Sequence, residues 1–326
     1  MSGRILVTGG AGYLGSALVA ELIRNGEAVT VMTGPDDGAA QPGGLGGAAE
    51  VVRADITDAA SVHAAMRGIS QVYHLAGIAS PNSRLAHTIW NTNVLGTYHV
   101  AQSALRLGVR RVVHVSSTAA IGYPPDGVVA DEQFDVRDSV LDNVYAATKR
   151  AGERVMLDFG ERGLDVVVVN PAAVFAPAAG PPRSWQALVT AARRGLLRGV
   201  PPGGTAVCSA RDFVAGATAA MVKGGSGERY ILSSVNLTYR RIAELLVEAV
   251  GRSHRVRTLP MGLFRTAGAG NRVIRDLIGH ARHDDALVPE NVELMGRHVY
   301  YASGKAEREL GMPRMSAAEL ITEFIR

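Results

Sequence analysis

Short apolar runs rich in β-branched residues alternate with helical segments through the first half of this chain. Nearly every position of these runs is apolar, as in parallel strands that are covered on both faces. Alternation of this kind builds βαβ units, so the sequence predicts an α/β fold with a doubly wound parallel (Rossmann) sheet. The expected strands are 4–8, 29–33, 51–54, 71–75, 111–116 and 165–170, and the expected helices are 13–25, 61–66, 86–107 and 139–162.

Three glycines follow the first expected strand, in the sequence TGGAGYLG at 8–15. Glycine at positions 9, 12 and 15 permits a tight turn, a close approach of the backbone to a pyrophosphate, and close packing of the next helix on the strand. That helix would direct its N-terminal N–H groups and the positive end of its dipole at the phosphates. The sequence therefore predicts a dinucleotide site at Gly9, Gly12 and Gly15.

The residues that follow later strands are also candidates, because ligands of such sheets bind at the carboxyl ends of the strands. Asp55 lies where a carboxylate could accept a hydrogen bond from an adenine amino group, whereas Asp58 is predicted to cap a helix. The sequence HLAG at 74–77 offers small residues against which a nicotinamide ribose could lie. His74 itself is expected to be packed in the core, with a general base as the alternative.

Tyr145 and Lys149 are four residues apart on an expected helix, so they share one face of it. A cation beside a phenol favours the phenolate, and we expect Lys149 to lower the pKa of Tyr145. The spacing alone is weak evidence, because chance supplies it in many helices. Hydroxyl groups at Ser116, Ser117 and Thr118 follow the fifth expected strand and would reach the same edge of the sheet.

Six short motifs occur in an order and at places that resemble the extended short-chain dehydrogenase/reductase superfamily, the NAD-dependent epimerase/dehydratase family. They are TGGAGYLG at 8–15, DITD at 55–58, HLAG at 74–77, Asn93 in NVLGT, SS at 116–117 and YAATK at 145–149. The resemblance implies that Ser117, or its neighbour Thr118, binds the substrate oxygen and that Tyr145 transfers the proton. It also implies that Lys149 contacts the nicotinamide ribose and that Asn93 extends a proton relay to solvent.

The same resemblance implies a set of residues that line an NAD or NADP cofactor. They are Gly9, Gly12, Tyr13, Leu14, Gly15, Thr33, Asp55, Ile56, Leu75, Ala76, Gly77, Asn93, Val115, Tyr145, Lys149, Pro171, Ala173 and Val174. The choice between the two cofactors stays open. Asp36 and Asp37 after the second strand would repel a 2′-phosphate and favour NAD, whereas reductases similar to this chain often use NADPH.

The second half resembles the branch with dihydroflavonol-4-reductase-like proteins and proteins named as hopanoid-associated sugar epimerases. GERYIL at 227–232 and Thr238, a predicted N-cap, carry this resemblance. Two positions depart from the pattern. Ala173 stands where nucleotide-sugar epimerases usually have Asn, and Arg211 replaces an Asp of the family's HVDD run. Arg211 is expected to form a surface ion pair, with an anionic substrate group as the alternative.

The expected organisation is a dinucleotide-binding domain at 1–172 and a mainly substrate-binding lobe at 173–326, with about 205–235 returning to the core. The predicted activity is that of a ketoreductase or alcohol dehydrogenase on a small metabolite, in specialised metabolism. One alternative is a nucleotide-sugar epimerase, dehydratase or 4-ketoreductase, which would retain NAD tightly without consuming it. A second alternative is a non-catalytic dinucleotide sensor, which would need the glycine loop but not the proton donor.

Composition limits the other classes. The chain has 326 residues, a net charge of +4, one cysteine, and arginines that are scattered rather than gathered on one face, so nucleic-acid binding is not expected. The single Cys208 excludes an intramolecular disulfide, gives no support for a metal site, and fits a reducing, cytoplasmic location. No apolar run approaches the length that spans a bilayer. By resemblance, we expect a homodimer through helices 86–107 and 139–162.

Overall fold

Seven parallel strands form the central sheet, which confirms the predicted α/β fold. The structure is a computed structural model that describes residues 3–35, 49–176, 185–267 and 289–325. The strand order is β11-β7-β5-β4-β1-β2-β3, so the order reverses beside β1 as in a doubly wound sheet. The strands are β1 (Arg4–Thr8), β2 (Val29–Thr33), β3 (Glu50–Arg53), β4 (Ile69–His74), β5 (Arg111–Val115), β7 (Val166–Pro171) and β11 (Arg229–Leu232).

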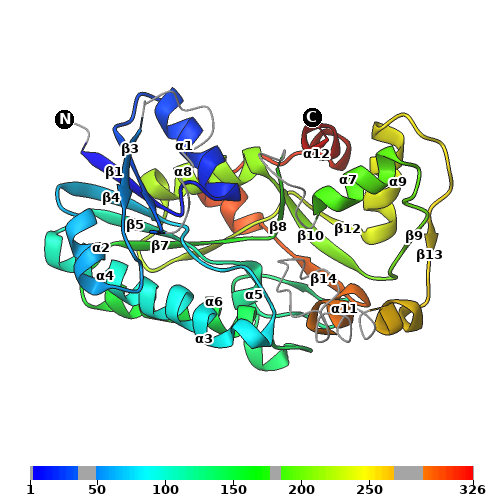
Figure 1. The fold of residues 1–326 in the computed structure, drawn as a ribbon, viewed down its shortest axis with the longest axis horizontal. Helices are drawn as coiled ribbons and strands as arrows, with labels where there is room; N and C mark the ends of the chain where they lie inside the picture. The colour runs from blue at the N-terminus through cyan, green and yellow to red at the C-terminus, as the bar shows by residue number, and fades with distance from the viewer. Residues whose placement is uncertain (1–2, 36–48, 177–184, 268–288, 326) are drawn as a thin grey trace.

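Helices cover both faces of this sheet (Figure 1). Two helices pack on one face of the sheet and three helices pack on the other face. On each face, the sheet and its helices form a separate apolar cluster. The first pair is α1 (Tyr13–Arg24) and α8 (Ala210–Lys223); the second layer is α2 (Ala59–Ala65), α4 (Gly96–Leu107) and α6 (Val144–Glu161). Such two-sided cover explains why β2 and β7 are buried at every position.

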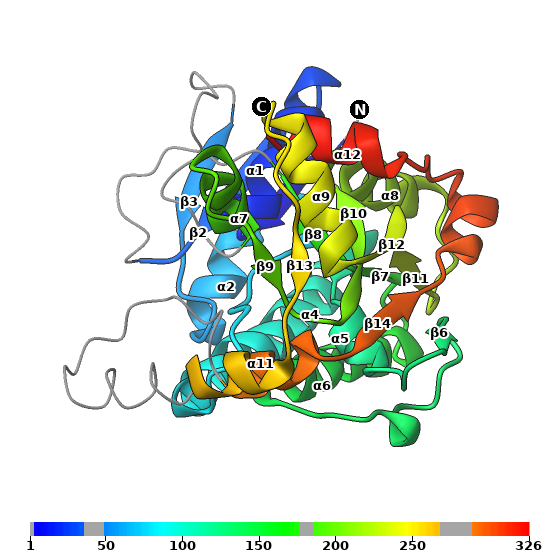
Figure 2. The same ribbon diagram turned by 90° about the vertical axis from the view of Figure 1, so that its right-hand side faces the viewer.

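A second, five-stranded sheet lies beside the first (Figures 1 and 2). Its strands are β6 (Val129–Ala130), β8 (Ala173–Phe175), β10 (Gly204–Ser209), β12 (Val235–Thr238) and β14 (His298–Tyr301). Three helices close an apolar core against it: α7 (Trp185–Arg193), α9 (Tyr239–Ala249) and α12 (Ala317–Phe324). Strands β9 (Gly199–Val200) and β13 (Arg257–Thr258) pair separately, and α11 (Pro289–Met295) precedes β14.

The segment from 205 to 235 divides between the two sheets. Strand β11 pairs with β7 in the seven-stranded sheet, whereas β10 pairs with β8, β12 and β14 in the other. Helix α8, between them, packs on β5 and β7. The predicted division at residue 172 falls between β7 and β8, and it stays a prediction.

Two expected helices differ in detail from the structure. The segment 86–107 is continuous but contains α3 (Ala86–Trp90), a π-helical turn at Asn91–Leu95, and α4. The helix expected at 139–162 begins only at Val144, because Asn143 is extended and its side chain accepts a hydrogen bond from Ala146 N. A short helix α5 (Thr118–Ile121) follows β5, and sequence reasoning missed it. Among the described residues, no helix is long and apolar enough to cross a bilayer.

Helix caps outside the site behave as the sequence indicated. Asp58 accepts a hydrogen bond from Ala60 N at the start of α2, and Thr238 accepts one from Arg241 N at the start of α9. Both caps satisfy N–H groups that the first turn of a helix leaves without a partner. The two predicted N-caps are therefore confirmed.

Candidate active site

The glycine loop between β1 and α1 is packed so tightly that Gly9 and Gly15 have no room for a side chain. Gly9 has φ +67°, a conformation that favours glycine, and a Cβ there would lie 2.9 Å from Ala76 N. A Cβ on Gly15 would lie only 2.2 Å from Gly9 O. Gly12 caps α1 without a side-chain hydrogen bond, which leaves the first-turn N–H groups for an anion. This geometry fits the diphosphate of a dinucleotide.

His74 is a packed residue in this structure, which confirms the favoured interpretation. The side chain is buried, with Nδ1 2.8 Å from Thr8 Oγ1 and Nε2 2.9 Å from Thr97 Oγ1. Thr97 Oγ1 donates its own hydrogen to Asn93 O at 2.6 Å, so the pattern assigns the proton of the imidazole to Nε2. Burial and the nearby Lys149 charge lower the pKa of His74 to about 3, which makes it too weak a base for proton abstraction near pH 7.

Asn93 lies in the π-helical turn and holds the loop after β4 in place. Its Oδ1 accepts from Ile78 N at 2.7 Å, and its Nδ2 donates to Ile78 O and to Thr148 Oγ1, both at 3.1 Å. Both amide hydrogens are therefore used within the protein. The structure gives Asn93 a positioning part, and the relay of protons to solvent stays a prediction.

Ser117, Tyr145 and Lys149 meet at the carboxyl edge of the central sheet. Ser117 follows β5, caps α5, and forms a side-chain hydrogen bond with Tyr145 on α6. Lys149, one turn further along α6, donates from Nζ to Val115 O at 2.8 Å. A Cβ on Gly77 would lie 4.0 Å from that Nζ, so the loop after β4 borders the same place. The structure thus brings together the three residues that the motifs singled out.

The expected effect of Lys149 on Tyr145 is corrected by the structure. Burial raises the pKa of Tyr145, the hydrogen bond with Ser117 lowers it in part, and the net pKa lies above the ordinary value of 10.0. Burial also lowers the pKa of Lys149 to about 8, although the negative charge of Glu153 raises it in part. Both shifts favour the uncharged forms, as expected for groups withdrawn from water. Without ligand, Tyr145 is a protonated phenol at neutral pH.

Thr118, the alternative to Ser117, faces a different partner. It is buried at the start of α5 and forms a side-chain hydrogen bond with Tyr301 of β14. The Tyr301 hydroxyl in turn donates to Gly122 O at 2.6 Å. The hydrogen bond to Tyr145 belongs to Ser117, so Thr118 is the weaker candidate for binding the substrate oxygen.

The remaining predicted cofactor positions lie along the carboxyl ends of the strands. Asp55, just after β3, is exposed and accepts from Thr57 N and Oγ1 at 2.8 and 2.7 Å, which lowers its pKa. Arg53, at the end of β3, is paired in register with Thr33 and donates to Pro35 O at 3.1 Å. The other positions end a strand, follow a strand end, start α1 or lie in β8: Val115 and Pro171 end β5 and β7, Ile56, Leu75 and Ala76 follow strand ends, Leu14 starts α1, and Ala173 and Val174 lie in β8. Asp36 and Asp37 lie outside the described residues.

Two contacts at the site escaped sequence reasoning. The Tyr13 hydroxyl donates to Ala176 O at 2.8 Å and accepts from Ala176 N at 2.6 Å, which ties the glycine loop to the end of β8. Glu153 is buried and accepts from Asn170 Nδ2 at 2.7 Å. A signal for the second existed, because Glu153 follows Lys149 by four residues and so lies on the same face of α6.

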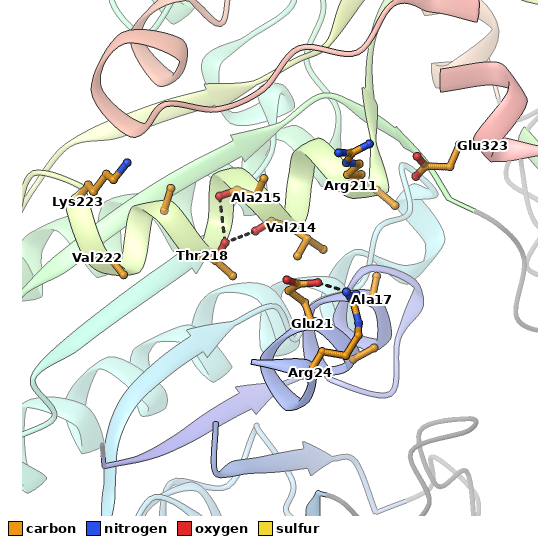
Figure 3. A pocket seen from close by; sticks show the side chains of 13 residues that line it. Ala17, Glu21, Arg24, Arg211, Val214, Ala215, Thr218, Val222, Lys223 and Glu323 are labelled. Atoms are coloured by element: carbon orange, nitrogen blue, oxygen red, sulfur yellow. Dashed lines mark hydrogen bonds and ion pairs between the residues drawn. The ribbon is translucent and has the colours of Figure 1, made fainter. Parts of the chain in front are cut away.

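Arg211 lies away from this site, on an open groove between α1 and α8 near the end of α12. Figure 3 shows its guanidinium beside the Glu323 carboxylate of α12. The pKa of Glu319, also on α12, is lowered mainly by hydrogen bonds with Ser316, to which the Arg211 charge adds. The side chain is exposed. Its exposed position agrees with the surface interpretation, and the alternative of a substrate-binding arginine stays a prediction.

The model of the NAD-dependent epimerase/dehydratase family matches residues 5–233 of the chain. The chain belongs to this family. It is 31% identical over 310 residues to "Sterol demethylase protein B" of Methylococcus capsulatus, which covers 94% of this chain and 92% of that protein. It is 29% identical over 312 residues to a 4-hydroxy-2-methyl-3-oxo-4-farnesyl-3,4-dihydroquinoline-1-oxide ketoreductase of Stigmatella aurantiaca, with coverage of 94% and 91%.

The relatives also support the branch that the second half resembles. A dihydroflavonol 4-reductase-like protein of Synechocystis sp. is 27% identical over 330 residues, or 100% of this chain and 94% of that protein. Among solved structures, gox2253 superposes with a TM-score of 0.82 at 24% identity, covering 99% of this chain and 96% of that chain. That likeness shows the fold. Family membership makes this chain an NAD-dependent enzyme of the extended short-chain type.

Proposed function

We propose that this family member is an NAD(P)-dependent ketoreductase, or the alcohol dehydrogenase of the reverse direction, that acts through Ser117, Tyr145 and Lys149. The observation that carries the proposal is the hydrogen bond between Ser117 and Tyr145 at the sheet edge, with Lys149 held one helical turn away on Val115 O. A dinucleotide sensor would need the glycine loop but would have no use for this arrangement.

The protein's part in the reaction is to hold the carbonyl and to supply a proton. When bound, the nicotinamide supplies a hydride to the carbonyl carbon. The Ser117 hydroxyl donates a hydrogen bond to the carbonyl oxygen, and the Tyr145 phenol gives its proton to that oxygen as negative charge develops there. Tyr145 is left as a phenolate, which the Lys149 ammonium stabilises until a proton returns from solvent. The raised pKa of Tyr145 ensures that the proton is present at neutral pH.

The proposed substrate is a ketone carried on an apolar molecule. Two relatives support this class by their names, one a sterol demethylase component and the other a ketoreductase of a farnesylated quinoline oxide. Ala173, in place of the Asn that nucleotide-sugar epimerases usually have, removes a polar side chain from the start of β8. An apolar ketone gains from the loss of that amide, whereas a nucleotide sugar loses a hydrogen-bond partner.

The proposed assembly is a homodimer through helices 86–107 and 139–162. Three large hydrophobic side chains on the first of these segments support it, because each is about two-fifths exposed: Trp90 at 43%, Leu95 at 42% and Tyr98 at 39%. A patch of this kind is typical of a surface that a partner covers. Sedimentation analysis that finds only a monomer at micromolar concentration would overturn this assembly.

The activity is tested by following NADH or NADPH absorbance with a panel of sterol, quinolone and 3-oxoalkanoate ketones. Tyr145→Phe should lower kcat by about 10²–10⁴-fold while the cofactor affinity changes little, because only the proton donor is lost. Tyr300→Phe, on β14, is the matched control and should keep full activity. A fully active Tyr145→Phe enzyme would refute the proposal. Turnover of nucleotide sugars with retained, unconsumed NAD would favour an epimerase instead.

A further inference from the structure

Glu153 is a carboxylate buried directly beneath the proposed proton-transfer site. It lies on α6, one turn beyond Lys149, and only 4% of its surface is exposed. Burial of a charge is costly unless hydrogen bonds and an opposite charge compensate it. Glu153 has both, because Asn170 donates to Oε2 at 2.7 Å and the Arg229 guanidinium lies 3.3 Å from Oε1. These two contacts hold the Glu153 carboxylate in one fixed position next to the proposed site.

Asn170 connects this carboxylate to the main chain of Ser117. The residue lies on β7 and is fully buried, and its Nδ2 donates both to Glu153 Oε2 and to Ser117 O, the latter at 3.1 Å. The Ser117 carbonyl is thereby fixed at the point where β5 gives way to α5. Because the Ser117 hydroxyl contacts Tyr145, a shift of this carbonyl would move the proposed substrate-binding hydroxyl as well.

The charge of Glu153 also acts on Lys149. Helix geometry places residues four apart on the same face, so the carboxylate is the nearest anion along α6. The other titratable groups around Lys149 are Tyr145 on α6, His74 on β4 and His114 on β5. Burial keeps both imidazoles uncharged, with the pKa of His74 near 3 and that of His114 well below its ordinary value. Glu153 is thus the one negative charge that the described residues set against the burial of Lys149.

We propose that Glu153 is a positioning residue of the proton-transfer site, which holds Ser117 through Asn170 and keeps Lys149 cationic through its own charge. The inference rests on the proposed function, because Glu153 would act through Ser117 and Lys149 and would not itself touch substrate or cofactor. It gives Glu153 two separable effects. One is geometric and passes through a hydrogen bond, and the other is electrostatic and needs only the charge.

The electrostatic effect can be measured on the free protein. The sequence has lysine only at positions 149, 223 and 305, so ε-¹³C-lysine NMR gives few signals, and Lys149→Met identifies the one of interest. Glu153→Gln keeps an oxygen for Asn170 but removes the charge. The Lys149 signal should titrate about one pH unit lower in this variant, which lowers the ratio of charged to uncharged Lys149 about tenfold at any given pH. Glu161→Gln, at the exposed end of the same helix, is the control and should leave the titration unchanged.

The geometric effect is measured with a substrate found in the ketone panel. Asn170→Ala should lower kcat by roughly ten- to a hundredfold, because Ser117 loses its anchor, while the Lys149 titration stays as in the wild type. Glu153→Gln should keep kcat at low pH and lose it at a lower pH than the wild type as Lys149 deprotonates. An unchanged Lys149 titration in Glu153→Gln, or an unchanged kcat in Asn170→Ala, would overturn the inference. The NMR result does not depend on Tyr145→Phe, so a failure of the proposed function remains distinguishable.

Discussion

The carboxyl edge of the seven-stranded sheet and the lobe on the five-stranded sheet are held by different kinds of contact. The carboxyl edge of the seven-stranded sheet buries a polar network that includes His74, Asn93, Glu153 and Asn170. The lobe built on the five-stranded sheet is held by an apolar cluster, in which the Phe175 ring contacts the rings of Trp185 and Phe324 at centroid distances of 4.8 and 4.6 Å. The polar network of the seven-stranded sheet therefore lies at the edge where the chemistry is proposed.

The difference teaches how one fold can keep its reaction while its substrate changes. Hydrogen bonds fix atoms in particular directions, so the network around the glycine loop and Tyr145 tolerates little substitution. Apolar packing depends mainly on volume and accepts many combinations of side chains. We infer that the lobe can vary to fit different apolar ketones while the sheet edge keeps the proton donor in place.

We expect the largest effect from Phe175→Ala, which tests whether apolar packing holds the lobe together. Removal of this buried ring should lower the free energy of unfolding by about 3–5 kcal/mol, because a cavity remains between Trp185 and Phe324. Leu196→Ala is the control, since that side chain is 69% exposed and should change stability very little. Urea unfolding measures both variants. A loss of less than about 1 kcal/mol in Phe175→Ala would show that the ring cluster does not hold the lobe together.

The position of Phe175 also shows what could be predicted from the sequence. Phe175, Leu197 and Leu196 are all apolar residues of the segment 173–326, which the sequence assigns to the substrate-binding lobe. The first two are buried in the lobe core, whereas Leu196 is exposed. Apolar character alone does not separate these outcomes, because it depends on which elements pack together in three dimensions. The sequence therefore predicted which part of the chain forms the lobe, but not which side chains contact one another within it.

The sheet edge was predicted far better, for a physical reason. Strand alternation determines the order of elements, and the carboxyl ends of parallel strands must meet, so Gly9, Ser117 and Tyr145 could be placed together from sequence. The contact of Tyr13 with Ala176 could not, because no motif links the two residues. Helix spacing places Glu153 on the Lys149 face of α6, but it does not show that Asn170 of β7 meets Glu153 there. The direction of the Tyr145 pKa shift was also missed, since burial raises this pKa by more than the hydrogen bond with Ser117 lowers it, and burial is invisible in sequence.

Gly15→Ala tests the edge of the seven-stranded sheet. An added Cβ would lie 2.2 Å from Gly9 O and 2.7 Å from Gly10 Cα, so the loop must move, at a cost of about 1–3 kcal/mol. Because the loop is the proposed phosphate site, NADH affinity measured by fluorescence titration should fall roughly ten- to a hundredfold. Gly160→Ala is the control, since a Cβ there makes only an ordinary contact at 3.9 Å. Equal NADH affinity in Gly15→Ala and wild type would contradict the proposed phosphate site.

The smallest expected effect separates two histidines within the polar network. His74 and His114 are paired in register on β4 and β5, with ring centroids 5.2 Å apart, and both are buried. His74 hydrogen-bonds through both nitrogens, whereas both nitrogens of His114 lack a partner among the described residues. An unpartnered buried polar group contributes a desolvation penalty without a compensating bond.

His74→Leu should therefore lower the free energy of unfolding by about 1–3 kcal/mol, because the Thr8 and Thr97 hydroxyls each lose a partner. His114→Leu should leave stability unchanged or raise it, since the substitution removes two unsatisfied nitrogens from the interior. Paired urea titrations at pH 7 compare the variants, with both imidazoles uncharged at that pH. If the two substitutions cost the same, hydrogen bonding does not distinguish the two positions, and apolar packing rather than the polar network holds this edge of the sheet.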